Sequence, residues 1–213
     1  MMKFAAALFD LDGTLQDSEI HWILATQAFL NDNGLDFNLA ATTALVYGRS
    51  STEIYLEIAA MEPFRGRTII DLASCIRDYY ERMTDDGDIS FPSSVALLKR
   101  MAQDMPVAIV SGSPLKDVKL AAHDLGVDGD VSLILGAEDV ERGKPAPDCF
   151  LKAASMLGVD PAKCAVFEDS TAGVAAAKAA GMFCVALVHS DRPPQDVSPA
   201  DVVVNDLSEF NYP

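Results

Sequence analysis

The stretch Phe4-Ala5-Ala6-Ala7-Leu8-Phe9-Asp10-Leu11-Asp12-Gly13-Thr14-Leu15 decides the fold. A short apolar run that ends in a turn signal is typical of a strand buried on both faces of a parallel sheet. Because side chains alternate along a strand, Asp10 and Asp12 point to the same side at its carboxyl end. Open α/β sheets bind ligands at that end, and two facing carboxylates need a cation or a shared proton between them. The alternative is a strand followed by an Asp-Gly hairpin turn, with no catalysis implied.

A helical block follows, from Asp17 to about Asp88. Apolar periodicity, glycine stops and polar caps predict helices over residues 18–33, 38–47, 50–61 and 68–83. No strand pattern interrupts these helices, and residues 84–88, Thr-Asp-Asp-Gly-Asp, close the block as a polar joint.

Strands and helices alternate in the rest of the chain. The pattern predicts strands over residues 106–110, 131–135, 165–167, 183–188 and 202–204, with helices over 93–103, 114–125, 148–157 and 170–180. Such alternation implies βαβ units. We therefore expect an α/β fold whose Rossmann-like parallel-sheet core is residues 1–15 and 89–213, with an α-helical cap domain, residues 16–88, inserted after the first strand. An insertion at that point is well placed to act as a lid.

Composition describes an ordinary globular protein. Half of the 213 residues are apolar and 23% are charged, and the net charge of −16 argues against nucleic acid or an anionic membrane as partner. The apolar run before Asp10 is too short for a signal peptide or a membrane span. The cysteines, without a CxxC pair, read as buried free thiols in a reducing cytoplasm; they are Cys75, Cys149, Cys164 and Cys184. Oligomeric state is not readable from the sequence.

Polar groups follow two more predicted strands. Ser111 and Gly112 follow the strand that ends at Val110, with Ser113 expected as helix cap and Pro114 as first helical residue. Hydroxyl and backbone N–H groups at a helix amino terminus form an anion site, although a well-capped loop is the alternative. Glu168 and Asp169 follow the strand over 165–167, and Asp169 is alternatively an N-cap.

Lys144 lies in the loop Arg142-Gly143-Lys144-Pro145-Ala146-Pro147. The prolines stiffen this loop, so Lys144 is a fixed charge suited to a phosphate oxygen and a carboxylate. A P-loop is rejected, because six residues separate Gly136 from Gly143 and a proline follows the lysine. The alternative is a solvated loop.

Four acids thus converge at one end of the predicted sheet: Asp10, Asp12, Glu168 and Asp169. Hard oxygen ligands in that number suit Mg²⁺, which keeps waters and accepts a substrate phosphate. Acids, a metal, a hydroxyl, a lysine and helix termini together indicate a phosphoryl-transfer site.

The order and spacing of these motifs resemble the haloacid dehalogenase superfamily. The motifs are Asp10-Leu11-Asp12-Gly13-Thr14, Ser111, Lys144-Pro145 and Glu168-Asp169, and the resemblance covers nearly the whole chain. Within the superfamily the chain is similar to the β-phosphoglucomutase-like sugar phosphatases. The resemblance implies a Mg²⁺-dependent phosphatase that forms an aspartyl phosphate and acts on a small phosphorylated metabolite.

The resemblance also implies a role for each matching residue. Asp10 would be the nucleophile and Asp12 the general acid and base. Ser111, the Gly112 N–H and Lys144 would stabilise the transferring group. Mg²⁺ would be held by Asp10, by the backbone carbonyl of Asp12 and by Asp169, with Glu168 assisting directly or through water.

Residues of the expected cap help to distinguish between the activities found within the family. Residues 16–88 contain no lysine. In the phosphonate hydrolases and β-phosphoglucomutases that the chain resembles, a lysine of the cap takes part in the reaction or in substrate binding, so the absence disfavours both activities. Trp22 stands where the mutase pattern has a histidine, and His21 is one position early, about 100° away on a helix. We therefore expect a phosphatase, and keep the mutase as the alternative.

Arg49, in the loop Gly48-Arg49-Ser50, is the expected substrate contact, with Trp22 as a wall that stacks on a sugar. The alternatives are an exposed charge for Arg49 and packing within the cap for Trp22 and His21. A sugar phosphate of hexose size is the expected substrate. Two rivals of other classes remain: a receiver-like signalling domain that accepts a phosphoryl group, and a catalytically idle binding protein on the same fold.

Overall fold

The computed structural model describes residues 4–47, 49, 51–84, 87–190 and 192–211. The chain divides into two compact units, which are Met1–Gln16 with Ser90–Pro213, the core unit, and Asp17–Ile89, the helical unit. The bounds expected from the sequence differ from these by one residue at each junction.

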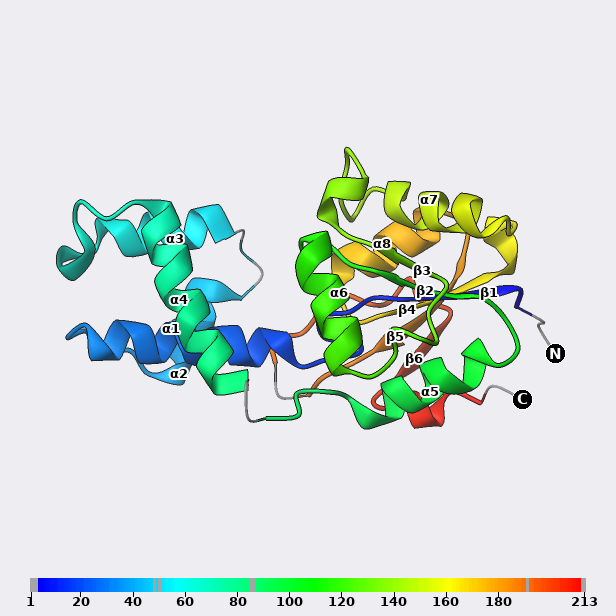
Figure 1. Cartoon of the computed structure of the whole chain (residues 1–213), viewed down its shortest axis with the longest axis horizontal. Coiled ribbons are helices and arrows are strands. Elements are labelled where there is room, and N and C mark those ends of the chain that lie inside the picture. Colours follow the sequence, from blue (N-terminus) through cyan, green and yellow to red (C-terminus); the bar gives the residue numbers. More distant parts are fainter. Residues whose placement is uncertain (1–3, 48, 50, 85–86, 191, 212–213) are drawn as a thin grey trace. The chain divides into compact units, whose positions relative to one another are not determined.

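A parallel sheet forms the middle of the core unit (Figure 1). Its six strands lie in the order β3-β2-β1-β4-β5-β6, and every neighbouring pair is parallel. The strands are β1 (Ala6–Phe9), β2 (Val107–Val110), β3 (Leu133–Leu135), β4 (Cys164–Glu168), β5 (Phe183–Leu187) and β6 (Val202–Val204). The α/β fold expected from the sequence is confirmed. Strand β4 runs one residue beyond its predicted end, because Glu168 still pairs with Ala186 of β5.

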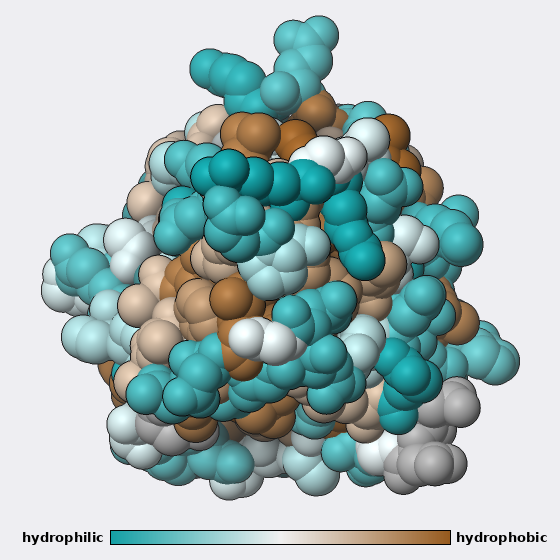
Figure 2. Space-filling view, turned by 90° about the vertical axis from the view of Figure 1, so that its left-hand side faces the viewer, coloured by the Kyte–Doolittle hydropathy of each residue, from teal (hydrophilic) through white to brown (hydrophobic). Residues whose placement is uncertain are grey.

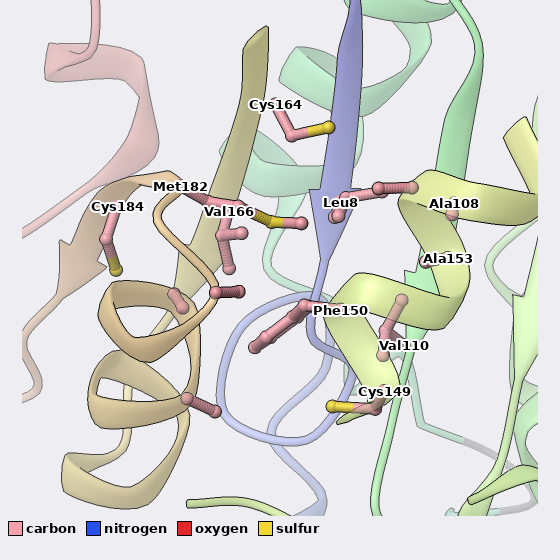
Figure 3. Packing of buried hydrophobic residues seen from close by; sticks show 14 of the residues in the cluster. Leu8, Ala108, Val110, Cys149, Phe150, Ala153, Cys164, Val166, Met182 and Cys184 are labelled. Atoms are coloured by element: carbon pink, nitrogen blue, oxygen red, sulfur yellow. The ribbon is translucent and has the colours of Figure 1, made fainter. Parts of the chain in front are cut away.

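Helices cover both faces of this sheet because each central strand is apolar on both sides. Ala6 and Leu8 pack with helices α7 (Asp148–Leu157) and α8 (Thr171–Ala179), while Ala7 and Phe9 pack with α5 (Pro92–Ala102) and α6 (Leu115–Asp124). Short 3-10 turns lie between β3 and α7, between α7 and β4, and after β6: η2 (Ala137–Asp139), η3 (Pro161–Lys163) and η4 (Leu207–Glu209). Figure 3 shows the first of these two layers, with Phe150 of α7 among Leu8, Val110 and Val166.

The helical unit has a core of its own. It comprises α1 (Ser18–Asp32), α2 (Leu39–Val46), α3 (Ser51–Ala60), η1 (Glu62–Phe64) and α4 (Ile69–Thr84). Its fully buried side chains include Phe64, Ile58 and Leu72, and Asn38 caps α2 by accepting a hydrogen bond from the Ala41 amide at 2.9 Å. Helix α3 begins at Ser51, and Ser50, the first residue of the helix predicted over 50–61, lies outside the described residues. Figure 2 shows a surface on which polar side chains predominate, with apolar patches between them.

All four cysteines are free thiols, and Cys75 alone is only half-buried. Within the described ranges, no helix combines the length and hydropathy needed to cross a lipid bilayer.

Replacing Phe167 with alanine should strongly destabilise the protein. The Phe167 ring stacks on Phe9 at 4.3 Å between centroids and meets the edge of Phe210 at 5.4 Å, in a fully buried position. The cavity should lower the free energy of unfolding by about 3–5 kcal/mol, measured by urea denaturation. Leu120→Ala, on an exposed helix position, should change it by less than about 0.5 kcal/mol. Equal effects of the two substitutions would contradict this packing.

Candidate active site

Three adjacent strands deliver the site residues at one edge of the sheet. Strand β1 lies between β2 and β4, so Asp10, Ser111 and Glu168 emerge side by side where these parallel strands end. The Asp10 amide continues the ladder by donating to the carbonyl of Phe167 at 2.9 Å. All three side chains are buried. The hairpin alternative for the first motif is wrong, because β1 pairs only with distant strands among the described residues.

Lys144 contacts the ends of all three strands. Its ammonium forms ion pairs with Asp10 and with Glu168, the latter at 2.6 Å, and donates to the Val110 carbonyl at 3.1 Å. It also lies 5.1 Å from the centre of the Phe150 ring. The solvated-loop alternative is therefore wrong. Lys144, whose bond to the following proline is cis, is a buried cation that bridges two carboxylates.

Glu168 is completely buried and its oxygens have several partners. One oxygen faces Lys144, and the other accepts from the Asp169 amide at 3.0 Å and from Ser170 through its amide and its hydroxyl. Gly173 makes room for it, because an added Cβ there would lie 1.8 Å from Glu168 Oε1. Glu168 therefore fixes both the ammonium and the start of helix α8.

Asp169 is not the cap of α8, because the Ser170 hydroxyl takes that role by accepting from the Gly173 amide at 3.0 Å. Its carboxylate instead packs against Gly13, which has φ +86° and would place an added Cβ 2.1 Å from Asp169 Oδ2. One oxygen from each of Asp10, Glu168 and Asp169 lies within 4.8 Å of the other two. Such a cluster of hard oxygen donors fits a divalent cation.

The charges in this group are unbalanced. Burial raises the pKa of Asp10 to about 8, even though Lys144 lowers it, because the neighbouring Glu168 and Asp12 also disfavour its ionisation. Burial disfavours the charge on Lys144, but Asp10 and Glu168 outweigh it and raise the pKa of the ammonium. The single lysine therefore does not satisfy the buried carboxylates, and a further cation would complete the balance.

Asp12 is held by three neutral groups. Its Oδ2 accepts from the Ser113 hydroxyl at 2.7 Å and from the Ser111 hydroxyl at 3.2 Å, and its Oδ1 accepts from Gln16 Nε2 at 3.1 Å. The expectation that Ser113 caps a helix is wrong: Pro114 is the N-cap of α6, the helix begins at Leu115, and the Ser113 hydroxyl turns to Asp12 instead.

Sequence reasoning missed three residues at this loop. Ser113 and Gln16 hold Asp12, and His189 Nε2 donates to the Gly13 carbonyl at 2.7 Å. Ser113 lies two residues after Ser111, and Gln16 lies four residues after Asp12, so proximity in the sequence could have indicated both. His189 gave none, because its partner is 176 residues away in the chain.

The remaining expected residues are Gly112, Arg49 and Trp22. Gly112 is exposed, and a Cβ added there would have no atom of the described residues within 4 Å, its two neighbours in the chain aside. Arg49 belongs to the helical unit, where it pairs with Glu57 at 2.7 Å and donates to the Leu45 carbonyl. Gly48 and Ser50, on either side of it, lie outside the described residues.

Trp22 also belongs to the helical unit, and it packs within it. Its ring stacks on Tyr80 at 4.3 Å, and the guanidinium of Arg77 lies 5.9 Å from the Trp22 ring centre. The neighbouring His21 contacts the Asp17 carbonyl through Nδ1 at 2.6 Å.

The core unit is thus a doubly wound α/β domain with an acidic, lysine-bridged site at the carboxyl ends of its strands. The model of the haloacid dehalogenase-like hydrolases matches residues 4–181, and the chain belongs to this family. The resemblance seen in the sequence is confirmed.

Relatives match over nearly the full length. The chain is 31% identical to validoxylamine A 7'-phosphate phosphatase of Streptomyces hygroscopicus subsp. limoneus, over 99% of this chain and 97% of that protein. It is 30% identical to hexitol phosphatase A of Escherichia coli, over 98% and 94%. It is 33% identical to β-phosphoglucomutase of Mycobacterium tuberculosis, over 98% and 92%. The crystal structure of CbbY from Rhodobacter sphaeroides with phosphate has the same fold, with a TM-score of 0.80 at 22% identity over 98% of this chain and 96% of that one.

Asp10→Asn should change how stability depends on pH in protein stripped of metal with EDTA. An unfolded aspartate has a pKa of 3.8 and folded Asp10 one of about 8, so the folded state holds a proton that the unfolded state releases between these values. The stability from this proton is fully present below about pH 4 and is lost as the pH rises through about 8. The free energy of unfolding of the wild type relative to the variant should therefore fall across this range.

Asp196→Asn is the matched control for that experiment. Asp196 is an exposed carboxyl whose pKa is lowered by its hydrogen bonds with Ser198, so its removal should leave the neutral range unchanged. Parallel profiles of unfolding free energy against pH for the wild type and Asp10→Asn would show that burial does not raise the pKa of Asp10.

Proposed function

We propose that this chain is a Mg²⁺-dependent phosphatase that hydrolyses a small phosphomonoester, a sugar phosphate of hexose size, through an aspartyl phosphate on Asp10. The observation that carries the proposal is the bridge of Lys144 to Asp10, beside Asp12, at the carboxyl ends of β1, β2 and β4. Family membership and the similarity to two sugar-phosphate-type phosphatases support it.

The chemistry divides between two aspartates. A carboxylate oxygen of Asp10 attacks phosphorus, the bond from phosphorus to the leaving oxygen breaks, and Asp12 gives its proton to that oxygen. Asp12 then takes a proton from the water that attacks phosphorus, inorganic phosphate leaves, and the Asp10 carboxylate is restored. Acid–base assistance of this kind contributes ~10²–10⁴-fold to the rate.

Neutral and cationic groups around Asp10 bind the transferred group. The Ser111 hydroxyl, the Gly112 N–H and the Lys144 ammonium are proposed to stabilise its oxygens, from β2 and from the loop before α7. These groups are fixed before the substrate arrives, since Ser111 and Lys144 are already held by Asp12, Asp10 and Glu168. They therefore add little reorganisation cost during the reaction.

The proposed Mg²⁺ ligands are Asp10, Asp169, the backbone carbonyl of Asp12 and Glu168, directly or through water. The clustered oxygens and the surplus negative charge beside Lys144 support this assignment. When bound, the ion neutralises charge on the substrate phosphate and lowers the pKa of Asp10.

A β-phosphoglucomutase-type phosphosugar mutase is the second candidate, favoured by 33% identity to the mycobacterial enzyme. Against it, the helical unit contains no lysine, and Trp22 stands in place of the expected histidine. We propose the helical unit as a cap and lid, with Arg49 and Trp22 as substrate contacts. The proposed location is cytoplasmic, in keeping with four free thiols. No nucleic acid or membrane partner is proposed.

Asp10→Asn should abolish turnover of p-nitrophenyl phosphate. Loss of the nucleophile should lower kcat by about 10³-fold or more in the presence of Mg²⁺. The wild type should lose activity in EDTA and regain it when Mg²⁺ is added. Phosphate release is followed for a panel of sugar phosphates in parallel.

Asp128→Asn, which removes an exposed carboxyl far from this site in the chain, should keep full activity. Activity of Asp10→Asn equal to that of the wild type would sink the proposal. Conversion of β-glucose 1-phosphate to glucose 6-phosphate without release of phosphate would favour the mutase.

A further inference from the structure

The carboxylate of Asp12 has neutral hydrogen-bond donors on both oxygens. Ser113 lies 2.7 Å from Oδ2, closer than Ser111 at 3.2 Å, and Gln16 Nε2 lies 3.1 Å from Oδ1. The serines come from the loop after β2, and Gln16 comes from the turn after β1. The plane of the carboxylate is therefore fixed from two directions.

The donors are themselves held by the backbone. The Ser113 amide donates to the Ser111 hydroxyl at 2.9 Å, and the Ser113 carbonyl accepts from the Ala137 amide at 2.9 Å. Together with the two contacts to Asp12, this makes a closed ring of hydrogen bonds. Ser113 is thus tied to two other parts of the core unit and has little freedom to turn away.

The backbone of Gln16 is also held in place. Gln16 is buried, its backbone N–H donates to the Leu11 carbonyl at 3.1 Å, and its backbone carbonyl accepts from the Gly13 N–H at 2.8 Å. It is also the last residue of the first segment of the core unit. Because the backbone of Gln16 is fixed, its side chain can position Asp12 without contacting a substrate.

We propose that Ser113 and Gln16 are positioning residues that aim the Asp12 carboxylate at the oxygen of the leaving group. The inference rests on the proposed function, in which Asp12 gives a proton to that oxygen. A hydroxyl both donates and accepts, so Ser113 keeps its contact with Asp12 whether or not Asp12 holds the proton. Small errors in such alignment are costly in rate.

Two substrates of similar size separate positioning from folding. p-Nitrophenyl phosphate releases a phenolate that is stable without a proton, whereas benzyl phosphate releases an alkoxide that needs one. Ser113→Ala and Gln16→Met should lower kcat/KM for benzyl phosphate by about tenfold or more, within the range for general acid catalysis. They should change kcat/KM for p-nitrophenyl phosphate by less than about threefold, which also shows in the same sample that the site is folded.

Conservative and matched variants complete the test. Ser113→Thr keeps the hydroxyl and should restore the ratio of the two kcat/KM values. Ser93→Ala removes another hydroxyl that donates to an aspartate, Asp206, at 2.8 Å, and Gln103→Met changes an exposed glutamine; both should leave the ratio at the wild-type value. Equal losses on both substrates, or no loss on either, would overturn the positioning role.

Asp12→Asn distinguishes this inference from the function on which it rests. It should lower kcat/KM for benzyl phosphate selectively and more strongly than either positioning variant. If Asp12→Asn has no selective effect, Asp12 is not the acid, and the proposed function fails together with the inference. If Asp12→Asn is selective and Ser113→Ala and Gln16→Met are not, the proposed function stands and only the positioning role fails.

Discussion

The ammonium of Lys144 between Asp10 and Glu168 is the interaction on which the site depends. It places one fixed positive charge among buried carboxylates that would otherwise repel one another. It also ties the loop before α7 to the ends of β1 and β4. The fold itself brings these residues together, because parallel strands present their carboxyl ends at a common edge of the sheet.

Close backbone approach allows the acids to gather there. Glu168 occupies the space beside Gly173, and Asp169 occupies the space beside Gly13, so neither glycine tolerates a side chain. The acids are therefore packed against the loop after β1 and the first turn of α8 rather than pointing into open solvent. This packing gives a physical reason for the glycines at positions 13 and 173 of this chain, and the surplus negative charge that it buries is what a further cation would balance.

The sequence predicted the architecture because apolar runs, glycine stops and alternation are local signals. Asp10 and Ser111 could be found because each directly follows a buried strand, and Glu168 could be found because it ends one. The hydroxyl of Ser113 was misread as a cap, since capping preferences are local and its true partner, Asp12, is 101 residues away. The buried environment of Lys144 was likewise invisible, because two partners 134 and 24 residues distant create it.

Chemical trapping of the enzyme during turnover tests the central claim most directly. Borohydride reduces an aspartyl phosphate to homoserine, so enzyme quenched in the presence of p-nitrophenyl phosphate and Mg²⁺, reduced and digested can be read by peptide mass spectrometry. The account predicts homoserine in place of Asp10 and unmodified Asp12. An unmodified Asp10 during steady turnover, or phosphate found on Ser111, would contradict it.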